Sequence, residues 1–352
     1  MVLPIIVALC SSLLIGLSVL LKPERVKFEI YPIVPIVGAL VLAFSGSISF
    51  KTIFSKLTEP SAANPLKVVV LFISTSLISV FLDETGFFEA LASFAAKKAG
   101  NSQFKIFFTF YITVSVLTVF TSNDIVILTF TPFILQFAKR AGIDPKPYVM
   151  AEFVAANTWS MLFLIGNPTN VYLTSAAGID FFTYLSVMWL PTIFAGLCSL
   201  LALLILFCKK LKKPLDKSII DIKLKDKPLA MLGVIVLGIC TVTVAISSYM
   251  GLEMWYVSAI SCAALYVVAL IVYAVRKEKP IVVTGGIKRA PWQMAPLVIG
   301  MFVIVLALDL SGFTELCAKF FGDSNVILKY GITSALSANL LNNIPMSVLF
   351  AS

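Results

Sequence analysis

Two long runs of the chain contain no charged residue, and they limit what it can fold into more than any other feature. Residues 3–21 and 181–208 are apolar on every side, and each matches or exceeds the roughly 20 residues that a helix needs to cross a membrane. Transmembrane barrels instead show alternating segments of about 10 residues. With 59% hydrophobic and 13% charged residues, the chain is predicted to be an all-α polytopic membrane protein.

The charged residues lie mainly in the loops between the apolar segments. The net charge of +9 comes from 27 basic and 18 acidic residues, and their positions follow the positive-inside pattern of membrane proteins. The expected partner is therefore a lipid bilayer, and no nucleic-acid partner is expected. The chain has no histidine, and its six cysteines form no C-x-x-C pair. These features exclude a zinc site of the His/Cys type and a histidine proton relay.

Eleven apolar segments follow one another along the chain, at 3–21, 30–50, 68–82, 106–123, 125–138, 147–177, 181–208, 228–252, 254–275, 290–308 and 326–352. Between 106 and 138 the only interruption is the polar tip Ser122-Asn123-Asp124, and the second arm covers only 125–138, about 21 Å as a helix. Such a short arm favours a re-entrant hairpin. Segment 147–177 is interrupted by Gly166-Asn167-Pro168-Thr169-Asn170, a pattern typical of a transmembrane helix broken at mid-membrane.

One motif occurs twice in the chain. "FLDETGFFEAL", from Phe81, returns as "ALDLSGFTELC", from Ala307, and each copy is followed by an apolar stretch that contains a polar Asn pair. We interpret the chain as two homologous halves. The first half is residues 1–208, with five spans plus the hairpin 106–138. A basic linker, 209–227, leads to the second half, 228–352.

The distribution of basic residues predicts the orientation of the halves. If the linker 209–227 is cytoplasmic, the loops on its side carry 22 of the 27 basic residues, and the N-terminus lies outside. Each half then has an odd number of crossings, so the halves have inverted topology, as in many secondary transporters. The two hairpin tips are expected to approach each other near the membrane midplane.

A hairpin tip joins the carbonyl end of one half-helix to the N–H end of the next. The first end suits Na⁺, and the second suits an anion or a polar solute. Asn123 and Asn343 offer both acceptors and donors there, although they can also simply cap the second arm. Asp124 can bind a cation or a proton, including Na⁺ together with Asn123, or stabilise the start of its helix.

The residues around the helix break offer a similar choice between binding and structural roles. Asn167, Thr169 and Asn170 offer side chains to a ligand, against the alternative of a packing kink. Asn157 and Thr158, two to three turns before the break, are weaker candidates. Glu152, five residues after Pro147, is expected near the cytoplasmic interface in an ordinary solvated role.

Three stretches carry a resemblance to a known family. "TSNDIVILTFTPF", "VAANTWSMLFLIGNPTNVYL" and "SANLLNNIPMSVL" resemble the signatures of the ion transporter superfamily, which includes arsenite permeases, citrate and divalent-anion symporters, and some sodium/proton antiporters. The resemblance covers essentially the whole chain and implies a homodimer with elevator-like alternating access. The positions that match the family's binding motifs are Ser122, Asn123, Asp124, Gly166, Asn167, Pro168, Thr169, Asn170, Asn342, Asn343 and Pro345.

The second half departs from the symmetry of the first. After Asp124 the first half continues to residue 208, whereas the sequence ends at Ser352, nine positions after Asn343. By the symmetry of inverted repeats we expect about 75 further residues. The second half is therefore predicted to be incomplete and to end inside its hairpin.

Together these features favour a multi-pass secondary active transporter of the cytoplasmic membrane that moves a small polar or anionic solute. The coupling ion is expected to be Na⁺ or H⁺, with no other cofactor. An ion channel, or an arsenite-type efflux permease that works with a partner protein, remains an alternative. The absence of a Walker-type loop and of clustered catalytic groups argues against ATP hydrolysis and against an intramembrane enzyme.

Overall fold

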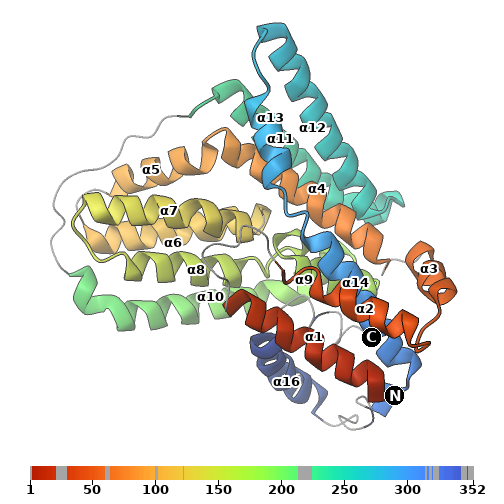
Figure 1. Ribbon diagram of the computed structural model, residues 1–352. Coiled ribbons are helices and arrows are strands. Elements are labelled where there is room, and N and C mark those ends of the chain that lie inside the picture. Colours follow the sequence, from red (N-terminus) through yellow and green to blue (C-terminus); the bar gives the residue numbers. More distant parts are fainter. Residues whose placement is uncertain are drawn as a thin grey trace. The chain divides into compact units, whose positions relative to one another are not determined.

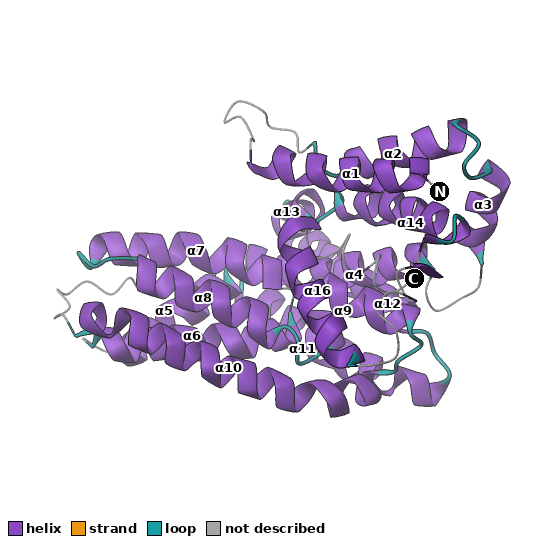
Figure 2. Cartoon of the chain, turned by 90° about the horizontal axis from the view of Figure 1, so that it is seen from below, coloured by secondary structure: helices purple, strands orange, loops and turns teal. Residues whose placement is uncertain are grey.

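The computed structural model of the 352-residue chain describes residues 2–20, 30–59, 64–99, 102–121, 123–212, 224–313, 315–316, 319, 325–341 and 347. Within these ranges the chain consists of helices and connecting loops, without strands (Figure 2). Among the described residues, six helical stretches are long and apolar enough to cross a membrane. The prediction of an all-α polytopic membrane protein is therefore confirmed.

The chain divides into two compact units, each made of several segments. The first unit contains Met1–Val70, Val171–Ile179 and Pro291–Ser352. Its helices are α1 (Val2–Leu20), α2 (Val34–Phe44), α3 (Phe50–Thr58), α14 (Met294–Leu310) and α16 (Val326–Leu341).

Helices α1, α2 and α14 pack side by side within this unit (Figure 2). Two glycines allow their close approach. A Cβ atom on Gly300 of α14 would come within 2.6 Å of the Pro35 backbone, and one on Gly38 of α2 within 2.7 Å of the Ser11 hydroxyl. Small residues at such crossings are typical of packed membrane helices.

The second unit contains Leu71–Asn170 and Asp180–Ala290. It includes most of α4 (Pro65–Glu84), and its other helices are α5 (Phe87–Ala99), α6 (Gln103–Phe120), α7 (Asn123–Arg140), α8 (Lys146–Trp159), the short 3-10 turn η1 (Leu164–Gly166), α10 (Phe181–Leu211), α11 (Lys227–Ile246), η2 (Ser247–Met250), α12 (Met254–Arg276) and α13 (Ile281–Arg289). Helix α9 (Pro168–Ala176) begins in this unit and continues into the first.

The core of the second unit lies among α6, α7, α8 and α10, which run alongside one another (Figure 1). Phe110 of α6 is fully buried, and its ring meets the rings of Phe133, Phe137 and Tyr148 in edge-on contacts at 5.8 to 6.2 Å. Helix α10 buries only a narrow stripe and leaves large apolar side chains such as Phe194 and Ile205 exposed. An exposed apolar surface of this kind fits contact with lipid.

The two copies of the repeated motif have the same local structure. In the first, α4 ends at Glu84, Gly86 has a φ of +77°, and its N–H donates to the Asp83 carbonyl at 2.8 Å. In the second, α14 ends at Leu310, Gly312 has a φ of +78°, and its N–H donates to the Asp309 carbonyl at 2.9 Å. The glycine is required because this left-handed backbone strains other residues.

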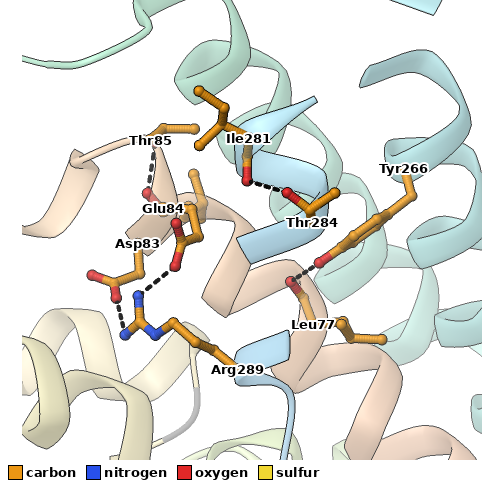
Figure 3. Close-up of polar contacts among 9 residues, drawn as sticks. Leu77, Asp83, Glu84, Thr85, Tyr266, Ile281, Thr284 and Arg289 are labelled. Carbon is orange, nitrogen blue, oxygen red and sulfur yellow. Dashed lines mark hydrogen bonds and ion pairs between the residues drawn. The ribbon is translucent and has the colours of Figure 1, made fainter. Parts of the chain in front are cut away.

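An ion-pair cluster holds α13 against the end of α4 (Figure 3). Arg289 donates through Nη2 to Asp83 at 2.5 Å and through Nη1 to Glu84 at 2.7 Å. Next to this cluster the Tyr266 hydroxyl of α12 donates to the Leu77 carbonyl at 3.2 Å. The two carboxylates thus have a structural partner that is distant in the sequence.

The arms of the first hairpin are longer than their apolar runs. Helix α7 begins at Asn123 and has 18 residues, as does α6, so each is about 27 Å long. The prediction of a shorter second arm was wrong because the helix also includes the polar residues at both ends of the apolar run. The re-entrant course of this hairpin stays a prediction.

Candidate functional site

The tip of the first hairpin is fixed to α8. Helix α6 ends at Phe120, and the N–H and hydroxyl of Thr121 both donate to the Leu117 carbonyl. One turn earlier, the Thr118 hydroxyl donates to the Ala156 carbonyl of α8 at 3.1 Å. Helix α7 starts directly after the tip. The tip therefore brings the carbonyl end of α6 and the N–H end of α7 next to the end of α8.

Asn123 and Asn157 connect the tip to α8 through their side chains. The Asn123 amide donates to Asn157 Oδ1 at 3.3 Å, and the Asn157 amide donates to the Phe153 carbonyl at 2.8 Å. Asp124 is the second residue of α7, while Ser122 lies outside the described residues. Asn123 and Asn157, which were predicted as separate site candidates, thus contact each other across two helices.

The helix break after α8 is held open by two asparagines. Asn167 Oδ1 accepts the N–H of Thr169 at 2.9 Å, which caps α9, and Pro168 occupies the first helical position. The Asn170 amide donates to the Ser160 carbonyl at 2.9 Å and to the Phe163 carbonyl at 3.3 Å. Asn167 and Asn170 therefore shape the break, and their side chains satisfy backbone groups that the broken helix frees.

Gly166 places the break against the hairpin tip. A Cβ atom here would lie 2.6 Å from the Ser160 carbonyl oxygen and 3.1 Å from that of Thr118. Both neighbours are backbone atoms, so no side-chain rotation could make room. The site thus combines the carbonyl ends of α6 and α8 with the N–H ends of α7 and α9, and it presents both partial charges to a ligand.

Two buried polar atoms at this junction have no hydrogen-bond partner within the described part of the chain. They are Oδ1 of Asn123, a residue that is only 4% exposed, and Oγ1 of Thr169. Unsatisfied buried polar atoms are rare because each costs about 1–3 kcal/mol. An amide oxygen and a hydroxyl suit a cation or the hydroxyl group of a solute.

Sequence reasoning missed the support behind the break. Trp159 donates through Nε1 to the Tyr111 hydroxyl at 3.3 Å, and that hydroxyl donates to the Gly196 carbonyl of α10 at 2.7 Å. Gly196 lies directly against the indole ring. These residues look like ordinary apolar span residues in the sequence, and only their contacts across three helices identify them.

Of the remaining predicted site residues, the structure describes Thr158. Thr158 is half-buried, and its carbonyl accepts the N–H of Met161 at 3.3 Å. Asn342, Asn343 and Pro345 lie outside the described residues. The proximity of the two hairpin tips therefore stays a prediction.

The interpretation of Glu152 was wrong. Its side chain is fully buried in α8, and both carboxylate oxygens lie 3.0 to 3.1 Å from the hydroxyl of Thr131 on α7. The position five residues after Pro147 suggested a solvated interface. Tertiary packing against α6, α7 and α10 buries it instead.

An exposed ion pair fixes the loop between α7 and α8 to the end of α10. Lys210 donates to Asp144 at 2.6 Å, and the Lys146 N–H donates to the same carboxylate at 3.0 Å. The hydrogen bond from Lys210 is the main cause of an Asp144 pKa below its ordinary value. This loop follows the end of α7 that lies opposite the hairpin tip.

Comparison with known proteins agrees with this architecture. The family model described as "Citrate transporter" matches residues 3–352. The arsenical pump membrane protein of Escherichia coli K12 is 28% identical over 291 residues, covering 78% of this chain and 65% of the relative. The arsenical pump membrane protein of Yersinia enterocolitica is 27% identical over 289 residues, with the same coverage.

The name of a third relative states no activity. The "46 kDa membrane protein" of Mycobacterium leprae is 29% identical over 119 residues, covering 34% of this chain and 28% of the relative. The chain spans about two thirds of the length of the arsenical pump proteins that it matches.

Proposed function

The chain belongs to the citrate transporter family, and we propose that it is a secondary active transporter of a small polar or anionic solute, coupled to Na⁺ or H⁺. The observation that carries this proposal is the buried oxygen of Asn123, which has no hydrogen-bond partner among the described residues, at the junction of the hairpin tip and the helix break. Discontinuous helices that face such a junction are typical of transporter binding sites.

The chemistry of the site favours an uncharged solute or a coupling cation. The side chains that meet at the tip and the break, from Thr118 to Asn170, are amides and hydroxyls without a basic group among those described. An anion would be held only by helix N-termini and amides. A neutral solute with several hydroxyl groups, such as undissociated arsenous acid, matches this set of donors and acceptors.

Two relatives are named arsenical pump membrane proteins, which supports arsenite efflux as the second candidate. We place the chain in the cytoplasmic membrane as a homodimer, with its N-terminus outside and residues 209–227 in the cytoplasm. The positive-inside distribution supports this orientation.

Transport by reconstituted chain tests the proposal. Arsenite, citrate and phosphate would each be offered to proteoliposomes under an imposed H⁺ or Na⁺ gradient. We expect at least one solute to enter with saturation and to follow the ion gradient. Uptake that never saturates and ignores the gradient would support the channel alternative instead.

A matched pair of variants assigns the uptake to the site. Asn123→Ala should abolish it because the substitution removes the amide from the junction. Ser186→Ala, at an exposed position of α10 outside the site, should retain it. Equal uptake by both variants would contradict the placement of the site.

A further inference from the structure

Glu152 is a fully buried acid that has no counter-charge among the described residues. In the part of the chain that the structure describes, its carboxylate contacts one polar side chain, the hydroxyl of Thr131, at 3.1 Å from Oε1 and 3.0 Å from Oε2. An ionised carboxylate that is removed from water costs several kcal/mol unless a cation or several donors compensate it. A bound proton removes this cost.

The geometry of the pair fits a protonated acid. Thr131 has one hydroxyl proton, so it can donate only one hydrogen bond to an ionised carboxylate. With a proton on Glu152, the acid O–H donates to Thr131 Oγ1 while the threonine hydroxyl donates to the other carboxyl oxygen. Both carboxyl oxygens lie within hydrogen-bond distance of the hydroxyl, so this reciprocal arrangement needs no movement of either side chain.

The Thr131 hydroxyl bonds to another helix, as that of Thr118 does, and not to a carbonyl of its own helix. The hydroxyls of Thr109 and Thr121 donate to the carbonyl four residues earlier in their own helix. The hydroxyl of Thr131 turns to Glu152 instead. The following residue, Pro132, has no N–H, which weakens the backbone ladder of α7 at this level.

Other ionisable groups on the neighbouring helices are engaged elsewhere or lie far along the helix. Those on the elements packed around Glu152 are Lys146 and Tyr148 on α8, Lys105 and Tyr111 on α6, Asp124, Lys139 and Arg140 on α7, and Tyr184, Cys198, Cys208, Lys209 and Lys210 on α10. The Tyr148 hydroxyl, one turn before Glu152, donates to Gln103 at 2.9 Å. Asp124 precedes Thr131 by seven residues, about 10 Å along α7.

Glu152 is connected to the proposed binding site through helices α7 and α8. The same two helices, α7 and α8, are joined at the tip by Asn123 and Asn157 and at a second level by Thr131 and Glu152. Asn157 follows Glu152 by five residues, about 7.5 Å along α8. A change in the Thr131–Glu152 contact therefore acts on the helix that orients Asn157.

We propose that Glu152 and Thr131 form a proton-binding site, separate from the hairpin tip, at which the transport cycle takes up and releases H⁺. The carboxylate receives the proton from water, becomes neutral and buried, and returns it to water when the contact between α7 and α8 opens. Three oxygens suffice for a proton, whereas hard cations such as Ca²⁺ take about six to eight. The role of this proton in transport rests on the proposed function; proton binding itself does not.

Infrared difference spectroscopy of the 352-residue chain in lipid nanodiscs tests proton binding without any solute. We expect a carbonyl band of a protonated acid that disappears in Glu152→Gln, an isosteric change that keeps a partner for Thr131. Thr131→Val should shift this band because the acid loses its hydrogen bond. Asp144→Asn, which alters an exposed carboxylate, should leave it unchanged.

Three spectroscopic results would overturn the proposal. The band could be absent from the unsubstituted chain, it could persist in Glu152→Gln, or it could vanish when Na⁺ replaces K⁺ at constant pH. The last result would identify a Na⁺ site in place of a proton site.

Flux measurements then test the role of the proton in transport. In proteoliposomes, Glu152→Gln should still exchange solute down its own gradient but should lose acceleration by an imposed pH gradient. Unchanged acceleration would refute the coupling role even if the acid band is present. If no solute moves with the unsubstituted chain, the proposed function fails, while the infrared result still decides whether Glu152 binds a proton.

Discussion

At the scale of single residues, the site depends on one glycine that has no space for a side chain and on one asparagine with a buried amide oxygen. Gly166 lies against two backbone carbonyls, and Asn123 keeps a buried oxygen without a partner among the described residues. Both residues were predicted from the sequence because Gly and Asn are unusual inside apolar segments. The sequence could not predict which asparagine caps a helix, as Asn167 does, and which keeps an oxygen for a ligand, as Asn123 does. Packing between helices decides this.

Gly166→Ala is expected to disable the site. The new methyl group would come within 2.6 Å of the Ser160 carbonyl, so the break must move away from the tip, at a cost of about 1–3 kcal/mol. Solute uptake should be lost, and the thermal midpoint in detergent should fall. Gly238→Ala is the control, because a Cβ there meets nothing within 4 Å. Equal effects of both substitutions would contradict the packing described for the break.

At the scale of elements, the sequence predicts helices well where they are apolar and poorly where they are amphipathic. The break after α8 and the hairpin α6–α7 were recognised, but α3, α5 and α13 contain too many polar residues to stand out as apolar segments. Glu152 was misjudged for a related reason. Its partner Thr131 comes from another helix, and no local pattern indicates that contact.

Arg289 connects α13 to the end of α4. Its substitution should therefore weaken the packing of α13 and lower the stability of the protein. Arg289→Ala leaves the carboxylate of Asp83, which is 6% exposed, without its cation. Because Arg289 is itself half-exposed, we expect a loss of about 1–3 kcal/mol rather than the larger cost of a fully buried pair. Thermal unfolding in detergent measures this effect.

The exposed pair Lys56–Glu59 provides the comparison. Lys56→Ala should change stability by only about 0–1 kcal/mol. In the double variant Asp83→Asn with Arg289→Ala, part of the lost stability should return, because no unpaired carboxylate remains at position 83. Additive losses in the double variant would show that the ion pair does not link α4 to α13.

At the scale of the whole molecule, packing and sequence divide the chain differently. The two compact units each combine segments from both halves of the sequence, whereas the halves were inferred from a motif that occurs once in each. Both copies of that motif form the same turn after a helix. The inverted orientation of the halves concerns the direction in which each half crosses the membrane, and a separate experiment tests it.

Accessibility of single cysteines tests that orientation. In a background without the six native cysteines, Lys212→Cys and Lys288→Cys should resist membrane-impermeant thiol reagents in intact cells and react after the cells are opened. Both positions belong to basic loops that we place in the cytoplasm. Lys329→Cys, on the side that receives few basic residues, should react in intact cells. Labelling in the reverse pattern would invert the topology.

Ligand protection at the helix break tests most directly the central claim, that the hairpin tip and the break form one binding site. Leu162→Cys places a thiol in the half-buried break, and Lys212→Cys serves as a control outside it. We predict that arsenite, citrate or Na⁺ slows labelling of Leu162→Cys in a saturable manner, leaves Lys212→Cys unaffected, and loses this effect when Asn123→Ala is added. Labelling of Leu162→Cys that no solute or ion slows, or protection that persists with Asn123→Ala, would contradict the account.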